Sequence, residues 1–167
     1  MRGDLEKVAK KIHEYYNAKK KDDQQRQSWD ELPVIKQLSN ISAANHIYTK
    51  LTLAGLSVDD VKEFGTASDF VSFLGAERIR NLAMDEHLRW NALHFANGWN
   101  TWELREIGEN AASNKDEARK LHACLVNWAD LSLVSERFKE DYHAYDYENV
   151  VKIFELIKDG VYSEHQH

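Results

Sequence analysis

Two short residue patterns occur twice along this chain, in the same order. The first is an apolar residue and an alanine, followed by a histidine four residues on and an aromatic ring three residues later. The second begins with tryptophan and has leucine three residues later. Such a repeat predicts two copies of one helical unit, packed about an approximate two-fold axis. The matched segments are Val8-Ala9-x-x-x-His13-x-x-Tyr16 with Leu82-Ala83-x-x-x-His87-x-x-Trp90, and Trp29-Asp30-Glu31-Leu32 with Trp128-Ala129-Asp130-Leu131.

Helical periodicity dominates the rest of the chain. Pro33 is the only proline, and seven glycines leave few other breaks. We predict an all-α fold of two pseudo-symmetric helical hairpins, about 1–56 and 76–160, joined by short helices into one domain, 1–160, with a frayed tail, 161–167. In the first half we expect a helix over 4–21 and a second that begins at Pro33 and is stopped by Gly55. Two short helices follow, one capped by Ser57 with Asp60, the other capped by Ser68 with Asp69 and closed by Gly75. In the second half we expect a helix over 76–97 that ends before Gly98, one capped by Ser132, and one over 146–158 closed by Gly160.

An aromatic-rich insertion from Gly98 to Cys124 makes the second half longer than the first. The helical pattern weakens here, and Trp99 and Trp102 predict a loop pinned to the body by burial of their rings. Residues 114–121 are predicted to form one or two helical turns, and 126–132 a connector. The first half has no counterpart of this insertion.

Composition and charge exclude several partners. The net charge is −6, and the one basic run, Lys19-Lys20-Lys21, is followed at once by two aspartates, so we expect no nucleic-acid partner. No apolar run approaches the roughly 20 residues of a bilayer span, and no signal segment opens the chain. We therefore expect a cytoplasmic protein with no membrane partner. Cys124 is the only cysteine, which excludes an intrachain disulfide and a cysteine-based zinc site.

The repeated pattern also predicts a binding surface. His13 shares a helix face with Tyr16, and His87 shares one with Trp90, because residues three apart are neighbours on a helix. If the two copies face each other, the two rings can sandwich a planar group while the imidazoles hydrogen-bond to it. Plain packing of two helices is the alternative.

The remaining aromatic and histidine residues have simpler interpretations. Four tryptophans are expected to anchor the core or loops, and His122 to satisfy a connector backbone. They are Trp29, Trp99, Trp102 and Trp128. His87 and His94 lack a third ligand at helical spacing, so no metal site is predicted. For Glu86 we expect Arg89, three residues on, as the partner.

These residues resemble the ryanodine-receptor repeat domain, or RyR domain. The first half is similar to the segment that precedes this domain in bacterial members, and the resemblance covers nearly the whole chain. The residues that carry it are Glu86-His87-x-Arg89-Trp90, Gly98-Trp99 and Lys120-x-His122-x-x-Leu125-Val126-x-Trp128-x-x-Leu131, with Trp29-x-Glu31-Leu32-Pro33, Ser39-Asn40, His46-Ile47 and Lys50-Leu51 in the first half.

The chain also departs from this family's pattern. Ala123 and Asn127 replace prolines, and Asn100-Thr101 replaces a tyrosine-glycine pair. The family's polar position before the last helix falls on Asp141 or Asp146. Asp146 keeps the family's spacing to Leu156 and is preferred.

The resemblance implies a non-catalytic, all-α domain that accepts an adenine nucleotide between its two halves, with no cofactor. Carried over residue by residue, it implies stacking by two rings, hydrogen bonds from two histidines and polar contacts from two further side chains. The implied ligand contacts are Tyr16, Trp90, His87, His13, Asn40 and Asp146.

Three function classes follow. A small-molecule binding and sensing module for a nucleotide-like ligand is the first. A protein-interaction or assembly module, whose partner is a second copy of the chain or another protein, is the second. The third is an enzyme built on His and Glu, which no nucleophile elbow, phosphate loop or metal motif supports.

Overall fold

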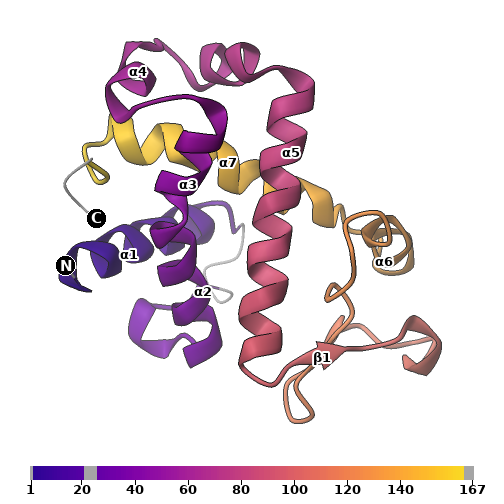
Figure 1. The fold of residues 1–167 in the computed structure, drawn as a ribbon. Coiled ribbons are helices and arrows are strands. Elements are labelled where there is room, and N and C mark those ends of the chain that lie inside the picture. The colour runs from indigo at the N-terminus through magenta and orange to yellow at the C-terminus, as the bar shows by residue number, and fades with distance from the viewer. Residues whose placement is uncertain (1, 21–25, 164–167) are drawn as a thin grey trace.

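The computed structural model describes residues 2–20 and 26–163, and it is mostly helical (Figure 1). The prediction of a helical chain is thus confirmed, with a small sheet added. The α-helices are α1 (Arg2–Ala18), α2 (Val34–Asn45), α3 (Ile47–Ala54), α4 (Val58–Glu63), α5 (Ala67–Ala96), α6 (Leu131–Phe138) and α7 (Tyr142–Lys158), and the 3-10 turns are η2 (Trp29–Glu31) and η3 (Leu104–Glu106).

The helix expected from Pro33 to Gly55 is divided in two. The α2 helix ends at Asn45 and α3 begins at Ile47, with His46 between them. This break redirects α3 so that Ile47, Lys50 and Leu51 are all buried against the rest of the body. Gly55 ends α3 as predicted, with the positive φ of 71° that favours glycine.

Capping residues explain the next two helix starts. Ser57 and Asp60 form the predicted capping box of α4. The prediction that Ser68 caps the following helix is wrong, because Thr66 accepts the backbone N–H of Asp69 and Asp69 accepts that of Thr66. Gly75, with a φ of 75°, interrupts α5 and separates its short first part from the long helix that carries Trp90.

The inserted segment contains a small sheet in place of the predicted helical turns at 114–121. Its strands are β1 (Asn100–Thr101), β2 (Lys115–Asp116) and β3 (Leu121–His122), in the order β1-β3-β2. The β1 strand pairs parallel with β3, and β2 antiparallel. Helical turns do not form here because β2 pairs with β3 across a short turn, and β3 also pairs with β1, which lies 21 positions earlier in the chain.

Two later helices begin earlier than predicted. Asp130, not Ser132, precedes α6, and the Ser132 hydroxyl instead donates to the Ala129 carbonyl. Asp141 caps α7 by accepting the N–H of Ala144, so the helix begins at Tyr142. Asp146 is consequently inside α7 and buried, rather than at its start.

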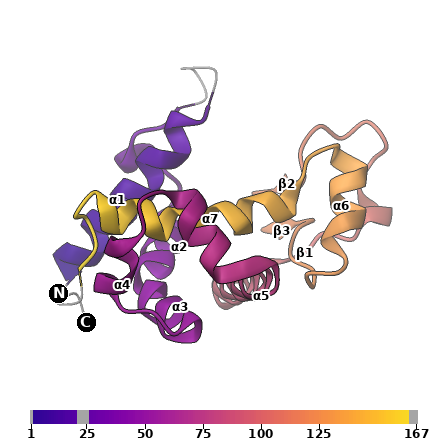
Figure 2. The same cartoon turned by 90° about the horizontal axis from the view of Figure 1, so that it is seen from above.

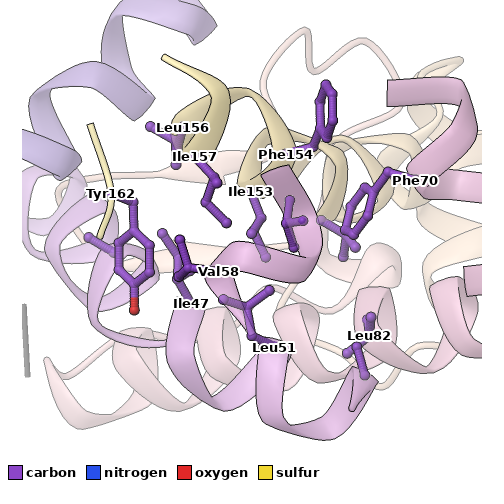
Figure 3. Close-up of a cluster of buried hydrophobic side chains, with 14 of the residues drawn as sticks. Ile47, Leu51, Val58, Phe70, Leu82, Ile153, Phe154, Leu156, Ile157 and Tyr162 are labelled. Atoms are coloured by element: carbon purple, nitrogen blue, oxygen red, sulfur yellow. The ribbon is translucent and has the colours of Figure 1, made fainter. Parts of the chain in front are cut away.

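The main core lies where α7 crosses α5 and is covered by α1 to α4 (Figure 3). Phe70 and Phe154 stack with ring centroids 5.9 Å apart. Tyr162 is only 2% exposed and belongs to this core, and Val161 packs against it, so the prediction of a frayed tail is wrong for these two residues. Residues 164–167 of that predicted tail lie outside the described residues.

A second, smaller core fills the lobe made by the sheet, η3 and α6, which we call the sheet lobe. Leu131, Val134 and Tyr142 lie at its centre, with Trp90 and Trp102 packed against it. Figure 2 shows α7 running from this lobe into the helical body. Within the described residues, no helix is long and apolar enough to cross a bilayer.

Candidate functional site

A cavity of about 740 Å³ opens where the body meets the sheet lobe. Its wall is built by α1, α2, α5 and α7 and by the segment around the sheet. All six predicted ligand contacts line it, so the fold brings together residues that are up to 133 positions apart in the sequence, as from His13 to Asp146. The six are His13, Tyr16, Asn40, His87, Trp90 and Asp146.

The two predicted stacking rings have different surroundings. Tyr16, on α1, is 40% exposed. The ammonium groups of Lys20 and Lys152 lie 4.9 and 6.0 Å from its ring centroid, within reach of a cation–π contact. Burial raises the pKa of the Tyr16 phenol, so this hydroxyl stays protonated at neutral pH.

Trp90, on α5, is half-buried among imidazoles. His94 lies 4.0 Å away between ring centroids, His122 meets the indole edge-on at 4.9 Å, and His87 is roughly parallel to it at 6.1 Å. Because three neighbouring rings contact it, the orientation of the indole is set before any ligand arrives. Such preorganisation lowers the entropic cost of binding.

His13 fastens α1 to the connector that leads to Trp29. Its Nε2 donates to the Gln27 carbonyl at 2.6 Å, and the Asn17 amide donates to the same oxygen at 2.7 Å. The His13 ring also meets Trp29 edge-on at 6.3 Å. We call His13, Asn17 and the Gln27 carbonyl the first clamp.

His87 makes the same set of contacts with the connector before Trp128. Its Nε2 donates to the Val126 carbonyl at 2.7 Å, and the Asn91 amide donates to that oxygen at 2.8 Å. His87 meets Trp128 edge-on at 6.2 Å. We call His87, Asn91 and the Val126 carbonyl the second clamp. In each clamp the asparagine Oδ1 is buried without a hydrogen-bond partner among the described residues.

Asp146 faces the other nitrogen of His87. Its Oδ2 lies 3.5 Å from His87 Nδ1, and the two residues are 7% and 3% exposed. Burial raises the pKa of the Asp146 carboxyl, and the interaction with His87 partly offsets that rise. The pair therefore forms a buried polar wall of the cavity.

A buried ionic network supports the α5 side of the cavity. Glu86 accepts Lys50 Nζ at 2.7 Å and Arg89 through both carboxylate oxygens, which confirms Arg89 as its predicted partner. Arg89 also donates to the Ser39 carbonyl of α2. The network ties α2, α3 and α5 together, and Arg89 also lines the cavity.

Asn40 is placed differently from the other predicted contacts. It lies on α2, on the same face as Lys36 and Ala43, and lines the cavity. Its side chain makes no hydrogen bond to another described residue, so both its donor and acceptor groups remain for a ligand.

Two further histidines and the cysteine lie on the same wall. His122 Nδ1 accepts the N–H of Cys124, so this nitrogen carries no proton. Burial, followed by repulsion from His94 and Lys115, lowers the pKa of His122 to about 3. Burial also lowers the pKa of His94 and raises that of the Cys124 thiol to about 12. All three groups are therefore neutral at pH 7, and the thiol is unsuited to nucleophilic attack.

The sequence interpretation missed several lining residues, above all lysines. Lys36, Lys115 and Lys152 lie on the cavity wall. One available signal was Lys152 within the apolar run 150–154, since it shares a face of α7 with Asp146 and Asn149. Lys115 had no such signal because its position depends on strand pairing.

In the described ranges, 2–20 and 26–163, no group of three or more His, Cys, Asp or Glu residues is arranged to hold a metal ion. No family model, curated protein or solved structure matches this chain. The function must therefore be argued from the residues of the cavity and their arrangement.

Proposed function

We propose that this protein is a non-catalytic RyR-type repeat module that senses a small adenine-nucleotide-like ligand in the cavity between α1, α2, α5 and α7. The observation that carries the proposal is the convergence of the six residues named from the sequence on one cavity of about 740 Å³. That volume lies within the range of about 300–1,000 Å³ of known small-molecule sites.

The aromatic side of the cavity suits a flat base. Trp90 is fixed by His87, His94 and His122, and base stacking on such a ring contributes roughly 1–3 kcal/mol. Asn40 and the His87–Asp146 pair add donors and acceptors beside it. A base needs both kinds of contact, because its faces are apolar and its edges are polar.

The charge of the cavity suits the rest of a nucleotide. Six basic residues line it against three acidic ones, although the whole chain has a net charge of −6. This local reversal of charge favours an anionic ligand and attracts it electrostatically. The basic residues are Lys20, Lys36, Arg89, Lys115, Lys120 and Lys152, and the acidic ones are Glu117, Glu140 and Asp146.

We also infer that the two halves of the chain, about 1–56 and 76–160, are copies of one unit related by an approximate two-fold axis. The matching contacts of the two clamps support this, because the same residue types bind equivalent backbone oxygens two residues before a tryptophan. As in the cytosolic receptor repeats that the chain resembles, we place the protein in the cytoplasm.

Binding without chemistry fits the groups in the wall. The Cys124 thiol is neutral, and His87 already donates to a backbone carbonyl while its other nitrogen faces Asp146. A nucleophile or general base needs a reactive, accessible group near its working pKa. These groups instead hold the cavity in shape.

Thermal shift measurements test the proposal with ATP, ADP, AMP, adenosine and ADP-ribose. We expect a saturable rise in Tm with at least one of them, and loss of that rise in Trp90→Leu. Trp102→Leu is the matched control, because Trp102 is also a half-buried tryptophan of the sheet lobe but does not line the cavity. Silence across the panel, or equal loss in both variants, would overturn the proposal.

An interaction module remains a second candidate because α5 has an exposed apolar stripe. Leu88 and Phe95, seven residues apart on one face, are 63% and 48% exposed. Such a stripe is typical of a surface that a second copy or another protein covers. Sedimentation of the wild type and of Leu88→Glu tests it: a dimer that the variant dissociates supports this function, and a monomer in both argues against self-association.

A further inference from the structure

The wall of the cavity near Tyr16 carries an unusual concentration of positive charge. Lys20 and Lys152 both approach the Tyr16 ring, from the end of α1 and from α7. Lys36, in the first turn of α2, lines the same cavity and lies within electrostatic range of Lys20. These three lysines come from three separate elements.

Lys152 is the most informative of them. It is only 5% exposed, yet within the described residues no carboxylate lies within ion-pair distance of its ammonium. Burial lowers the pKa of this group and the charge of Lys19 lowers it further, while Glu148, Glu155 and Glu86 offset part of this from beyond ion-pair distance. A buried cation without a counterion destabilises the fold unless something else supplies negative charge.

The start of α2 adds a second, independent signal. Helix N-termini present free backbone N–H groups and a partial positive charge, which acidic side chains usually neutralise. The first turn of α2 contains no acidic residue and no side-chain cap, and it contains Lys36 instead. Residues Val34, Ile35 and Lys36 all line the cavity, so this helix end faces the same space as Lys152.

Lys36 also lacks a close counterion, since its ammonium makes no ion pair with a described residue. Burial lowers the pKa of Lys36, the charges of Lys115 and Lys20 lower it further, and Glu117 offsets only part of this. Like charges are thus held near one another around a helix N-terminus. Phosphate groups bind to this combination of backbone N–H donors and lysines in many proteins.

We propose that the Tyr16 end of the cavity, formed by the N-terminus of α2 with Lys36 and Lys152, is a subsite for a phosphate chain of two or more phosphates. This rests on the proposed ligand site in the cavity and gives it a direction, with the base against Trp90 and the phosphates toward Tyr16. Tyr16 then shapes the anion end and holds the lysines rather than stacking on the base.

The test uses sodium tripolyphosphate as a probe that has no base, at constant ionic strength set with NaCl. Isothermal titration calorimetry on the wild type should give saturable binding. Lys36→Gln and Lys152→Gln should each weaken it about tenfold, the loss expected for one charge-assisted hydrogen bond. Lys36→Arg keeps the charge and should retain most of the affinity.

Lys10→Gln is the matched control. Lys10 lies on α1, like Tyr16, but is exposed and paired with Glu6 outside the cavity. Its loss should leave tripolyphosphate binding unchanged. Neither Lys36 nor Lys152 forms an ion pair with a described carboxylate, so their variants should keep or raise the Tm of the unliganded protein, and a loss of binding can be told from unfolding.

The outcomes separate this inference from the proposed function. If tripolyphosphate binds and the two lysine variants weaken it, but no adenine compound binds more tightly, the subsite stands and the adenine proposal fails. If adenosine binds and ADP gains nothing over it, the subsite is overturned while the base site stands. Absence of saturable tripolyphosphate binding, or equal weakening in Lys10→Gln, also overturns the subsite.

Discussion

The first and second clamps do the same local task in different settings. In each, a histidine and an asparagine one helical turn later donate to a single carbonyl oxygen, at 2.6 and 2.7 Å in the first and 2.7 and 2.8 Å in the second. The first closes a connection of 10 residues between Asn17 and Gln27, whereas the second closes one of 35 residues between Asn91 and Val126.

The second clamp has supports that the first lacks. Asp146 faces His87, but no carboxylate is paired with His13 in the described residues. The residue before His87 is Glu86, which joins two buried cations, whereas the residue before His13 is the apolar Ile12. A longer connection costs more entropy to close, so additional contacts at its base are physically reasonable.

The aromatic residue of each pattern shows the consequence for the cavity. Trp90 is enclosed by three imidazoles, while Tyr16 is 40% exposed and lies beside lysines. Two copies of one pattern therefore end in unlike surfaces, one aromatic and neutral, the other open and cationic. The difference teaches that a repeat in sequence can build an asymmetric site.

The largest expected difference in the free energy of unfolding is between a substitution at Glu86, beside the second clamp, and one at the exposed Glu6 on α1, the helix of the first clamp. Glu86→Gln leaves Lys50 and Arg89 buried without their shared counterion, and should lower the free energy of unfolding by about 3–5 kcal/mol in urea denaturation. Glu6→Gln, which breaks the exposed pair with Lys10, should cost less than about 1 kcal/mol. Similar losses in the two variants would show that the buried network contributes little.

The histidines of the two clamps should show the next largest difference in the free energy of unfolding. His87→Ala removes a hydrogen bond and leaves Asp146 buried without its partner, so we expect a loss of about 3 kcal/mol. His13→Ala should cost about 1–2 kcal/mol, because Asn17 still donates to the Gln27 carbonyl and no carboxylate is left unpaired. Adding Asp146→Ala to His87→Ala should recover part of the loss; no recovery would exclude Asp146 as the source of the asymmetry.

Lowering the pH should lower the free energy of unfolding because burial keeps His122 neutral in the folded protein. Its folded pKa of about 3 lies below the unfolded value of 6.5, so the unfolded chain binds more protons in between, and stability falls as the pH drops from 6.5 toward 3. The expected loss at pH 5 is about 2 kcal/mol. His122→Asn, which offers an oxygen to the Cys124 N–H, should flatten the profile.

The comparison of these two proteins is matched because both retain Asp146, whose raised pKa acts in the opposite direction. The folded state binds more protons at that carboxyl than the unfolded state does, so the contribution of Asp146 to the free energy of unfolding rises as the pH falls. Urea denaturation from pH 7.5 to 4.5 measures the difference. Parallel profiles for wild type and His122→Asn would show that His122 does not drive the acid sensitivity.

The asparagines of the two clamps should show the smallest difference in the free energy of unfolding. Asn17→Ala and Asn91→Ala each remove one of two donors to a carbonyl, at 2.7 and 2.8 Å, so each should cost about 1 kcal/mol. We expect the two losses to agree within about 0.5 kcal/mol, since the supports of the second clamp act through His87 and not through Asn91. A much larger loss for Asn91→Ala would mean that the clamps are not locally equivalent.

Local signals made much of the helical body predictable from the sequence. The capping box of Ser57 and the stop at Gly55 depend on residues within one turn of the helix end. The paired pattern of His13 and His87 also named residues that line one cavity. The interruption at His46, which separates α2 from α3, has no such local signal and was not predictable in this way.

The chain's periodicity and repeated pattern determined that it is helical and which helix faces carry the histidines and rings. Only the tertiary structure decided that Lys36 and Lys152 share a cavity with Trp90, and that residues 114–121 pair as strands. The physical reason is the range of the interactions. Helix propensity and capping act within about four residues, whereas burial of a lysine and pairing of two-residue strands depend on segments that folding brings together from far along the chain.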